Sequence, residues 1–393
     1  MSLGNAGPLY LALDQGGHAS RAIVYDRTGR AVARATMEVG VSRLDADRVE
    51  QDGEELAQSL SQVAREALAS LGPGAKRVVA AGLATQRASI ACWDRETGAT
   101  LGPVLSWQDR RASARLDALH LDIEMVHRIT GLRPSAHYGA SKLAWCLENL
   151  PSVSLASAQG RLAFGPLASF LVFRLTREKK LLADPANAQR TLLYDVYKRH
   201  WNDDLAGFFG IPLSALPRAV TSRHGFGSIE TGPATVPLEF VTGDQSAALF
   251  AFGNPAPNTL FVNLGTGAFL QRLAPAVATR SGLLRSIAVD DGARAVYTQE
   301  GTVNGAGAAL TWYAADRGIA DIESHLAEWL DSVRTPPFFV NGVSGLGSPW
   351  WAWTRAPWRT SCATFPLGDC TVPGRQQALS ELRENCSLRT FGR

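Results

Sequence analysis

The first 40 residues alternate apolar stretches with short polar turns. Apolar runs at Pro8–Leu13 and Ala22–Tyr25 have the length and residue types of β-strands. The turn Asp26-Arg27-Thr28-Gly29 separates the second run from another apolar stretch at Ala31–Ala35. The pattern therefore predicts a hairpin or meander over residues 8–40.

The pattern then changes from strand spacing to helix spacing. Residues 52–71 place their apolar side chains on one stripe of a helix, at Leu56, Leu60, Val63, Ala67 and Leu71. Asp52 is suited to cap the N-terminus of this helix, and Gly72-Pro73-Gly74 is suited to end it.

The remaining pattern alternates buried strands with helices. Continuous apolar runs predict strands at Val78–Ala84 and Ile90–Trp93, and further strands begin near Phe240 and Leu260. Helices are expected at about residues 111–129, 139–149, 166–175 and 305–317. This order of elements is typical of the α/β fold class.

Two similar glycine turns lie far apart in the chain. One joins the apolar stretches of residues 11–24 through Asp14-Gln15-Gly16-Gly17, and the other joins those of residues 260–270 through Gly265-Thr266-Gly267. Glycine allows close approach of the backbone, and the free N–H groups of such a turn can bind an anion. The pair suggests two related lobes around a phosphate-bearing ligand. Taken singly, each turn favours a plain hairpin, because most glycine-rich hairpins hold no phosphate.

Length and charge predict two domains and argue against nucleic-acid and membrane partners. At 393 residues the chain is too long for one ordinary core, so two domains are expected. A net charge of +3 without a long basic run argues against nucleic acid as a partner. The apolar runs are too short to span a bilayer, so no membrane partner is expected.

The cysteines and the first residues point to the cytoplasm. Five cysteines without paired spacing do not form a disulfide framework, and none has the spacing of a zinc site. The segment Met1–Pro8 lacks the features of a signal peptide. Neither a P-loop nor the dinucleotide-binding glycine motif is present, which excludes two common nucleotide-binding folds.

A set of motifs in one order resembles the FGGY carbohydrate kinases, and within them the glycerol kinase branch. The resemblance covers residues 9–351 and is carried by Ala12–Gly16, Ser20–Asp26, Val49–Asp52, Thr85–Arg87, Cys92–Gly98, Ser106–Arg111, Thr130–Leu132, Ser141–Leu143, Asn187-Ala188, Arg190-Thr191, Gly243–Phe250, Leu264–Gly267, Glu300-Gly301, Ala306–Ala309 and Ser344–Pro349.

The resemblance implies the actin-like, ribonuclease-H-like fold, with two α/β lobes around a central cleft. The first lobe would bind substrate over residues 1–252, and the second would bind nucleotide over residues 253–393 as a partial lobe. The implied reaction transfers a phosphoryl group from ATP, with Mg²⁺, to a hydroxyl of a sugar or polyol. The expected partners are small molecules, and a homodimer is left open.

The resemblance also assigns roles to individual residues. Asp244 would be the general base, and Asp14 would hold Mg²⁺ through water. Taken without the family, Asp244 is better explained as a turn or helix-capping aspartate, and Asp14 is also explained as a turn aspartate. The substrate would contact Arg87, Trp107, His137, Asp244, Gln245 and Phe269. The nucleotide would contact Gly16, Gly17, His18, Arg21, Gly265, Thr266, Gly267, Gly307 and Thr311.

Several positions depart from the pattern of glycerol kinases. Gly17-His18 replaces a Thr-Thr pair, Ala88 replaces a glutamate, and His137 stands at the position of a substrate tyrosine. Loss of an acceptor at position 88 weakens discrimination for glycerol and points to a larger sugar or polyol.

The last part of the chain departs further. After Trp351 the usual family segment is not found, and no clear apolar period appears between Ala352 and Arg393. Two alternatives to an active kinase therefore stay open. One is a catalytically impaired, sugar-binding member without a complete adenine pocket, and the other is an actin-like ATPase clamp.

Overall fold

The computed structural model describes residues 7–265, 267–275, 282–332, 345–348 and 351. The chain forms two compact units. Unit 1 comprises Met1–Phe261 and Leu270–Gly301, and unit 2 comprises Val262–Phe269 and Thr302–Arg393. The chain passes between the units inside strands β16 (Phe261–Leu264), β17 (Ala268–Ala274) and β19 (Ala295–Val303). The assignment of lobes to residues 1–252 and 253–393 stays a prediction.

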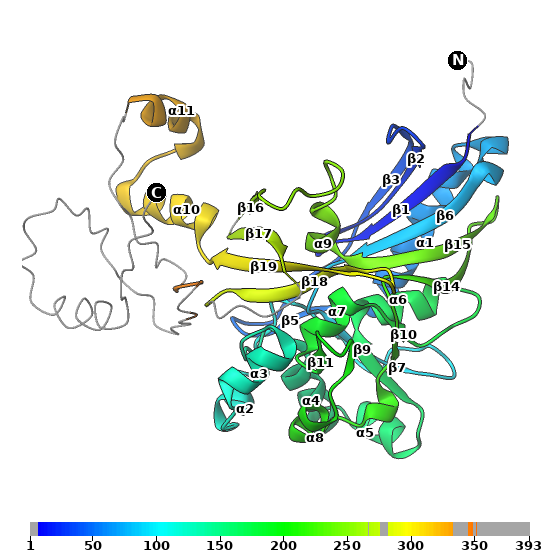
Figure 1. The fold of residues 1–393 in the computed structure, drawn as a ribbon, viewed down its shortest axis with the longest axis horizontal. Coiled ribbons are helices and arrows are strands. Elements are labelled where there is room, and N and C mark those ends of the chain that lie inside the picture. Colours follow the sequence, from blue (N-terminus) through cyan, green and yellow to red (C-terminus); the bar gives the residue numbers. More distant parts are fainter. Residues whose placement is uncertain (1–6, 266, 276–281, 333–344, 349–350, 352–393) are drawn as a thin grey trace, which may run out of the picture. The chain divides into compact units, whose positions relative to one another are not determined.

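The central element of unit 1 is a six-stranded mixed sheet with the order β14-β15-β6-β1-β2-β3 (Figure 1). Its strands are β1 (Leu9–Gln15), β2 (Ala19–Asp26), β3 (Ala31–Glu38), β6 (Val78–Thr85), β14 (Arg223–Glu230) and β15 (Thr235–Gly243). The first three strands form an antiparallel meander, as the hydropathy pattern over residues 8–40 predicts. Strand β6 runs parallel to both β1 and β15.

The register of the three parallel strands aligns their carboxyl ends. Asp14 of β1 and Thr242 of β15 both pair with Ala84 of β6. Gly243 and Gln15 pair with the next residue of β6, Thr85. Residues that follow these positions therefore emerge at one edge of the sheet, where ligands of open α/β sheets usually bind.

Two helices cover one face of this sheet. Helix α1 (Gly53–Ala69) buries Leu56, Leu60 and Val63, and Asp52 accepts a hydrogen bond from Glu54 N as its N-cap. This is the helix and the cap that the sequence predicts. Helix α6 (Leu167–Leu175) is almost wholly buried beside α1. The odd-numbered leucines of β1 point into the same core.

A second sheet of five strands, ordered β4-β5-β8-β7-β9, joins the helices of residues 113–158. Its strands are β4 (Ser42–Arg43), β5 (Val49–Gln51), β7 (Ile90–Asp94), β8 (Val104–Leu105) and β9 (Leu162–Pro166). The helices are α2 (Ser113–Ala118), α3 (Ile123–Thr130), α4 (Gly139–Asn149) and α5 (Pro151–Ala158). The single helix expected at 111–129 was wrong, because Asp122 caps a new helix by accepting from Met125 N.

Short elements complete unit 1. They are η1 (Gly72–Arg77), β10 (Leu182–Ala183), α7 (Pro185–Ala188), η2 (Gln189–Thr191), β11 (Tyr194–Asp195), β12 (His200–Trp201), α8 (Asp203–Phe209), η3 (Leu213–Ala215), β13 (Arg218–Ala219), α9 (Asp244–Ala248) and β18 (Leu284–Asp290). Strand β18 pairs antiparallel with β19, so that Leu284 lies opposite Glu300.

Unit 2 contains β16 (Phe261–Leu264), which begins at the unit boundary, and two helices, α10 (Ala306–Arg317) and α11 (Ile322–Ser332). Helix α10 lies within the predicted range of 305–317. The segment from Ala352 onward, on which the prediction of a partial lobe rests, lies outside the described residues. No helix in the described part of the chain combines the length and apolar character needed to cross a membrane.

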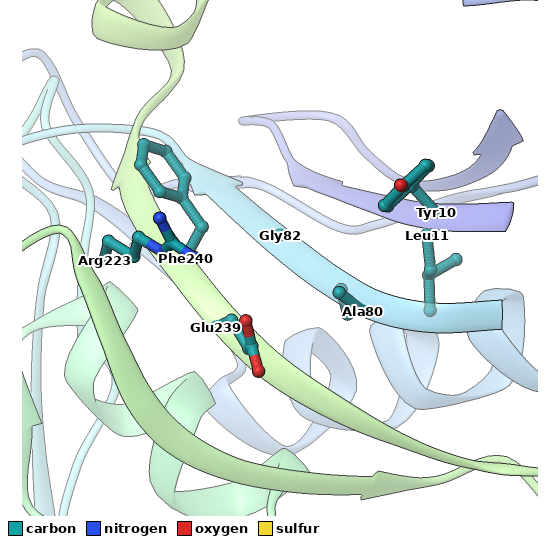
Figure 2. Close-up of a pocket in the computed structure, with 8 residues that line it drawn as sticks. Tyr10, Leu11, Ala80, Gly82, Arg223, Glu239 and Phe240 are labelled. Atoms are coloured by element: carbon teal, nitrogen blue, oxygen red, sulfur yellow. The ribbon is translucent and has the colours of Figure 1, made fainter. Parts of the chain in front are cut away.

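Two hollows lie in unit 1. One, of about 240 Å³, lies over strands β1, β6 and β15 between Tyr10, Gly82, Arg223 and Phe240 (Figure 2). Another, of about 450 Å³, lies beside Tyr197 and the β18–β19 hairpin. The residues that line these two hollows include none of the predicted site residues.

Candidate functional site

Two carboxylates lie at the aligned strand ends of unit 1. Asp14 is the sixth residue of β1, and Asp244 follows β15 directly as the first residue of α9. Their side chains are 40% and 35% exposed, so both can meet a ligand. Partial burial raises the pKa of Asp244, the guanidinium of Arg87 lowers it, and the charge of Asp14 raises it. The charge of Asp14 is therefore close enough to influence Asp244.

Arg21 is the partner of Asp14 in this structure. Its Nη1 lies 2.8 Å from Asp14 Oδ2, across the β1–β2 pair, and both side chains are substantially exposed. An exposed ion pair of this kind is weak. Both groups can therefore reorient toward a ligand, and the role of Arg21 in phosphate binding stays a prediction.

Arg87 lies beside Asp244 and is largely buried. Its side chain is only 9% exposed, and its Nε is 3.9 Å from Asp244 Oδ1. Gly243 makes room for it, since a Cβ there would be 2.4 Å from Arg87 Cδ and 2.5 Å from Cγ. The backbone before the carboxylate and the arginine stem are thus in direct contact.

A buried cluster holds the head of Arg87. Glu300 Oε1 accepts from Arg87 Nη1 at 3.0 Å, and Glu300 Oε2 accepts from Arg190 Nη2 at 2.6 Å. Gln271 Nε2 donates to Oε1 at 2.9 Å, and Arg190 Nη2 also donates to Ser286 Oγ at 2.7 Å. Burial alone would raise the pKa of Glu300, but the two guanidinium groups outweigh burial and hold it below its ordinary value.

Aromatic rings form another wall of this region. The rings of Trp107 and His137 have centroids 5.8 Å apart, and those of His137 and Tyr138 are 5.0 Å apart. Burial, together with the charges of Lys142, Arg110 and Arg190, holds the pKa of His137 well below its ordinary value. The imidazole is therefore neutral at pH 7 and can serve only as a neutral hydrogen-bonding group.

Lys142 joins the loops that carry these residues. Its Nζ is fully buried and donates to the backbone carbonyls of Ser106 at 2.7 Å and Ala88 at 3.2 Å. Ala88 has a φ of 65°, in the left-handed region that non-glycine residues rarely adopt. Lys142 thus stabilises a strained loop between Arg87 and Trp107.

The ammonium group of Lys142 gives the fold a pH dependence. Burial lowers the pKa of Lys142 from 10.5 to about 7 in the folded chain. Between these values the unfolded chain binds more protons, so the free energy of unfolding rises with pH, by up to about 1.4 kcal/mol per pH unit. We expect Lys142→Met to abolish this rise, so that the variant's deficit relative to the parent grows from pH 7 to pH 10.

Urea unfolding at several pH values would measure this effect. Lys180→Met is a matched control. Lys180 also donates to a backbone carbonyl, that of Gly225, but it does so at an exposed position. Equal slopes of stability against pH in the parent and in Lys142→Met would contradict the prediction.

The first glycine turn is oriented by buried amides. Gly16 N donates to Ala19 O at 3.0 Å, which closes the turn. Gln86 Nε2 donates to Gly16 O at 3.3 Å, and Gln51 Nε2 donates to Gly17 O at 3.0 Å. The side-chain amides of Gln86 and Gln51 thus fix the orientation of the Gly16 and Gly17 carbonyls. His18, the third predicted nucleotide contact here, is exposed.

The second glycine turn lies in unit 2. Gly265 N donates to Gly267 O at 2.8 Å, and Gly307 N donates to Gly265 O at 2.9 Å, so three predicted nucleotide residues are brought together. Thr311 donates to Gly307 O at 3.4 Å from the next turn of α10. Thr266 lies outside the described residues.

The predicted site residues fall into two sets. Unit 1 gathers Asp14, Gly16, Gly17, His18, Arg21, Arg87, Trp107, His137, Asp244 and Gln245, whereas unit 2 carries Gly265, Gly267, Phe269, Gly307 and Thr311. Gln245 N donates to Asp244 Oδ1 at 2.6 Å.

The donor set fits a magnesium nucleotide. No group of three or more His, Cys, Asp or Glu side chains among the described residues is arranged to hold a metal. Mg²⁺ keeps most of its waters and binds the phosphates of a nucleotide, so it needs few protein ligands. The accessible carboxylate of Asp14 is suited to be one of them. The second glycine turn lies at the start of α10, where Gly265 N and Gly307 N already donate to carbonyls, so its role in phosphate binding stays a prediction.

Three buried charged residues of this region received no role from the sequence. Glu300, Arg190 and Lys142 lie within recognised motifs, but hydropathy gives no sign that a charged side chain is buried.

Comparison with known proteins shows the family of this chain. A sequence profile of the N-terminal domain of the FGGY family of carbohydrate kinases matches residues 9–251. The glycerol kinase of Bordetella pertussis is 37% identical over 362 residues, which cover 88% of this chain and 70% of that enzyme. The glycerol kinase of Alcanivorax borkumensis is 34% identical over 353 residues, with 88% and 71% coverage.

Solved structures share the fold. The crystal structure of Plasmodium falciparum glycerol kinase with ADP superposes with a TM-score of 0.81 at 23% identity, covering 89% of this chain and 72% of that one. The xylulose kinase of Rhodospirillum rubrum gives a TM-score of 0.78 at 19% identity, with 92% and 74% coverage. These likenesses confirm the predicted actin-like α/β fold. The chain belongs to the FGGY family of carbohydrate kinases, which are phosphotransferase enzymes.

Proposed function

We propose that the chain transfers the γ-phosphoryl group of ATP to a hydroxyl of a sugar or polyol, with Asp244 as the general base. The observation that carries this proposal is the accessible pair of Asp14 and Asp244 at the aligned strand ends, with Asp244 beside Arg87 but not in direct contact with it. A carboxylate whose pKa is raised by burial and whose oxygens are accessible is suited to accept a proton.

Each residue of unit 1 has a distinct part in this proposal. Asp244 accepts the proton of the attacking hydroxyl, and Arg87 and Gln245 hydrogen-bond neighbouring oxygens of the substrate. Trp107 and neutral His137 pack against its carbon face. Phosphoryl transfer depends chiefly on such positioning and on charge neutralisation.

The phosphate end is held by backbone and by Asp14. N–H groups of the second glycine turn other than those of Gly265 and Gly307 would bind phosphate oxygens, and Asp14 would hold Mg²⁺, which neutralises phosphate charge when bound. The sequence relatives named above are glycerol kinases, and a kinase of this family uses ATP with Mg²⁺. A cytoplasmic location belongs to the same proposal, supported by two free, buried cysteines in unit 1, Cys92 and Cys146.

The substrate class is a sugar or polyol larger than glycerol. Ala88 supplies no carboxylate where glycerol kinases have a glutamate, and Glu300 is already saturated by Arg87, Arg190 and Gln271. Asp244 is then the principal carboxylate acceptor for substrate hydroxyls in unit 1. A substrate with more hydroxyls or a carbonyl would regain affinity through the donors Arg87 and Gln245.

The test is Mg²⁺-dependent release of ADP by the purified chain with glycerol, erythritol, xylulose and ribulose, with Asp244→Asn as the blank. Release with one substrate, lost in the variant, would establish the activity and identify the substrate. Binding of a sugar without ADP release would favour the impaired, sugar-binding alternative. ATP hydrolysis without any polyol requirement would favour an ATPase instead.

Gly243 provides a further prediction at this site. Its φ of −82° is open to any residue, so Gly243→Ala acts only through its new methyl group against Arg87. We expect displacement of Arg87 and a rise in KM for the polyol of about tenfold, equivalent to about 1.4 kcal/mol. Steady-state kinetics would measure it, with Gly207→Ala as a control that meets no atom within 4 Å. Unchanged KM in Gly243→Ala would contradict this role of Arg87.

A further inference from the structure

Glu300 has more donors around it than a simple ion pair would need. Three side chains donate to its two oxygens, Arg87 from the loop after β6, Arg190 from η2 and Gln271 from β17. The Glu300 side chain is only 5% exposed. Both oxygens are thus occupied, and Glu300 is unsuited to accept a hydrogen bond from a substrate.

The guanidinium group of Arg87 lies near two carboxylates, those of Glu300 and Asp244. Its stem lies against Gly243, so the guanidinium can turn but the stem has little room to move. In unit 1, Nη1 is bound to Glu300 at 3.0 Å, and Nε faces Asp244 at 3.9 Å. A guanidinium and a carboxylate that meet without competition form a direct, often bidentate pair.

We propose that Glu300 is a positioning residue that acts through Arg87, holding its guanidinium back from the Asp244 carboxylate so that the carboxylate stays free to receive the substrate proton. The functional part of this inference rests on the proposed function, in which Asp244 is the base. The structural part, the restraint of Arg87 by Glu300, does not depend on any activity.

The charges support this division of roles. Arg190 binds Glu300 at 2.6 Å and fixes it independently of Arg87, while Gln271 fixes the oxygen that faces Arg87. Without the negative charge of Glu300, the buried cations Arg87 and Arg190 would be left without an anion between them. The anions that remain nearby are Asp244 and Asp14. Arg87 is the cation that can reach Asp244, because it is already adjacent to it.

The first test is the crystal structure of Glu300→Gln. Glutamine keeps the shape of the side chain and loses its charge. We expect Arg87 to turn from the altered position and to bind Asp244 Oδ1 or Oδ2 directly, at roughly 2.8 Å instead of 3.9 Å. Glu300→Asp is the second variant, since it keeps a charge to balance Arg190 but its shorter side chain cannot reach both arginines. Arg87 left in its original place in both variants would overturn the proposal, whether or not the chain is an active kinase.

The second test is kinetic. We expect Glu300→Gln to lower kcat on the order of 100-fold, the effect of misplacing a catalytic group by about 1 Å, with a smaller change in KM. The double variant Glu300→Gln with Arg87→Gln should be no slower than Arg87→Gln alone, because Glu300 acts only through Arg87. A double variant that is slower by the full product of the two single effects would overturn the proposal.

Glu54→Gln is the matched control. Glu54 also pairs with an arginine in unit 1, Arg174, but it lies on α1 away from the carboxylate pair. Its kcat and KM should equal those of the parent. If the parent shows no phosphoryl transfer, the proposed function fails while the crystallographic comparison still decides the restraint of Arg87.

Discussion

Replacement of Asp244 by asparagine is expected to lower kcat by roughly 10²–10⁴-fold, the range for loss of a general base. Asparagine keeps the size and one oxygen of the side chain, so KM for the polyol should change much less than kcat. Steady-state measurement of ADP release with the substrate identified by the panel would determine both constants.

Stability separates this catalytic role from a structural one. Because burial raises the pKa of Asp244 in the folded chain, its ionised form is less favourable there than in the unfolded chain. Asp244→Asn should therefore be at least as stable as the parent at pH 7. Asp204→Asn, an exposed change on α8, should leave both rate and stability unaltered. A variant with normal kcat, or one that loses activity only because it unfolds, would contradict Asp244 as the base.

Replacement of Arg190 by glutamine is expected to lower the free energy of unfolding by about 3 kcal/mol, the lower end of the cost of breaking a buried ion pair, because Arg87 and Gln271 still bind Glu300. The Arg190 and Glu300 side chains are each 5% exposed, and their closest N–O distance is 2.6 Å. Urea unfolding at pH 7 would measure the loss. Arg177→Gln should change stability by less than about 0.5 kcal/mol, since Arg177 is 63% exposed in its ion pairs.

The effect of Arg190→Gln should also depend on pH in a defined direction. The folded chain holds the pKa of Glu300 below 4.5, so its contribution to stability is fully present above pH 4.5 and is lost as the pH falls further. The deficit of the variant should therefore be largest near neutral pH and shrink in acid. A deficit that stays constant between pH 7 and pH 3 would show that Arg190 acts by packing rather than through Glu300.

Much of the fold could be predicted because local patterns and tertiary structure agree in unit 1. The meander of β1–β3, the capped helix α1 and the buried strand β6 each follow from hydrophobic period and turn residues. The break between α2 and α3 was missed, because the apolar period continues across Leu119–Asp122 and only the capping role of Asp122 marks it. A pattern of burial cannot distinguish one long helix from two that share a face.

The site was predictable to a different extent. Polar residues after apolar strands, such as Asp14 and Asp244, are visible in the sequence, and parallel pairing with β6 brings them together. The Arg87–Glu300–Arg190 cluster was not visible, since up to 213 positions separate its members in the chain. Only the tertiary fold shows that these charges neutralise one another. Burial of Lys142 is also hidden in the sequence. Its hydrogen-bond partners are backbone carbonyls, which every residue has, so no partner residue type marks them.

The shared register of β1, β6 and β15 has a consequence for how this chain can tolerate insertions. Because successive strand residues face opposite sides of a sheet, one extra residue inside β15 would exchange its buried and open faces and misdirect the segment that leads into Asp244. The turns at Asp26–Arg30 and Thr231–Ala234 close through local backbone bonds at the far ends of their strands. Length changes should therefore be accepted in those turns and rejected within the three parallel strands, so that natural variation in length and sites for inserted tags are both confined to the edge opposite the carboxylates.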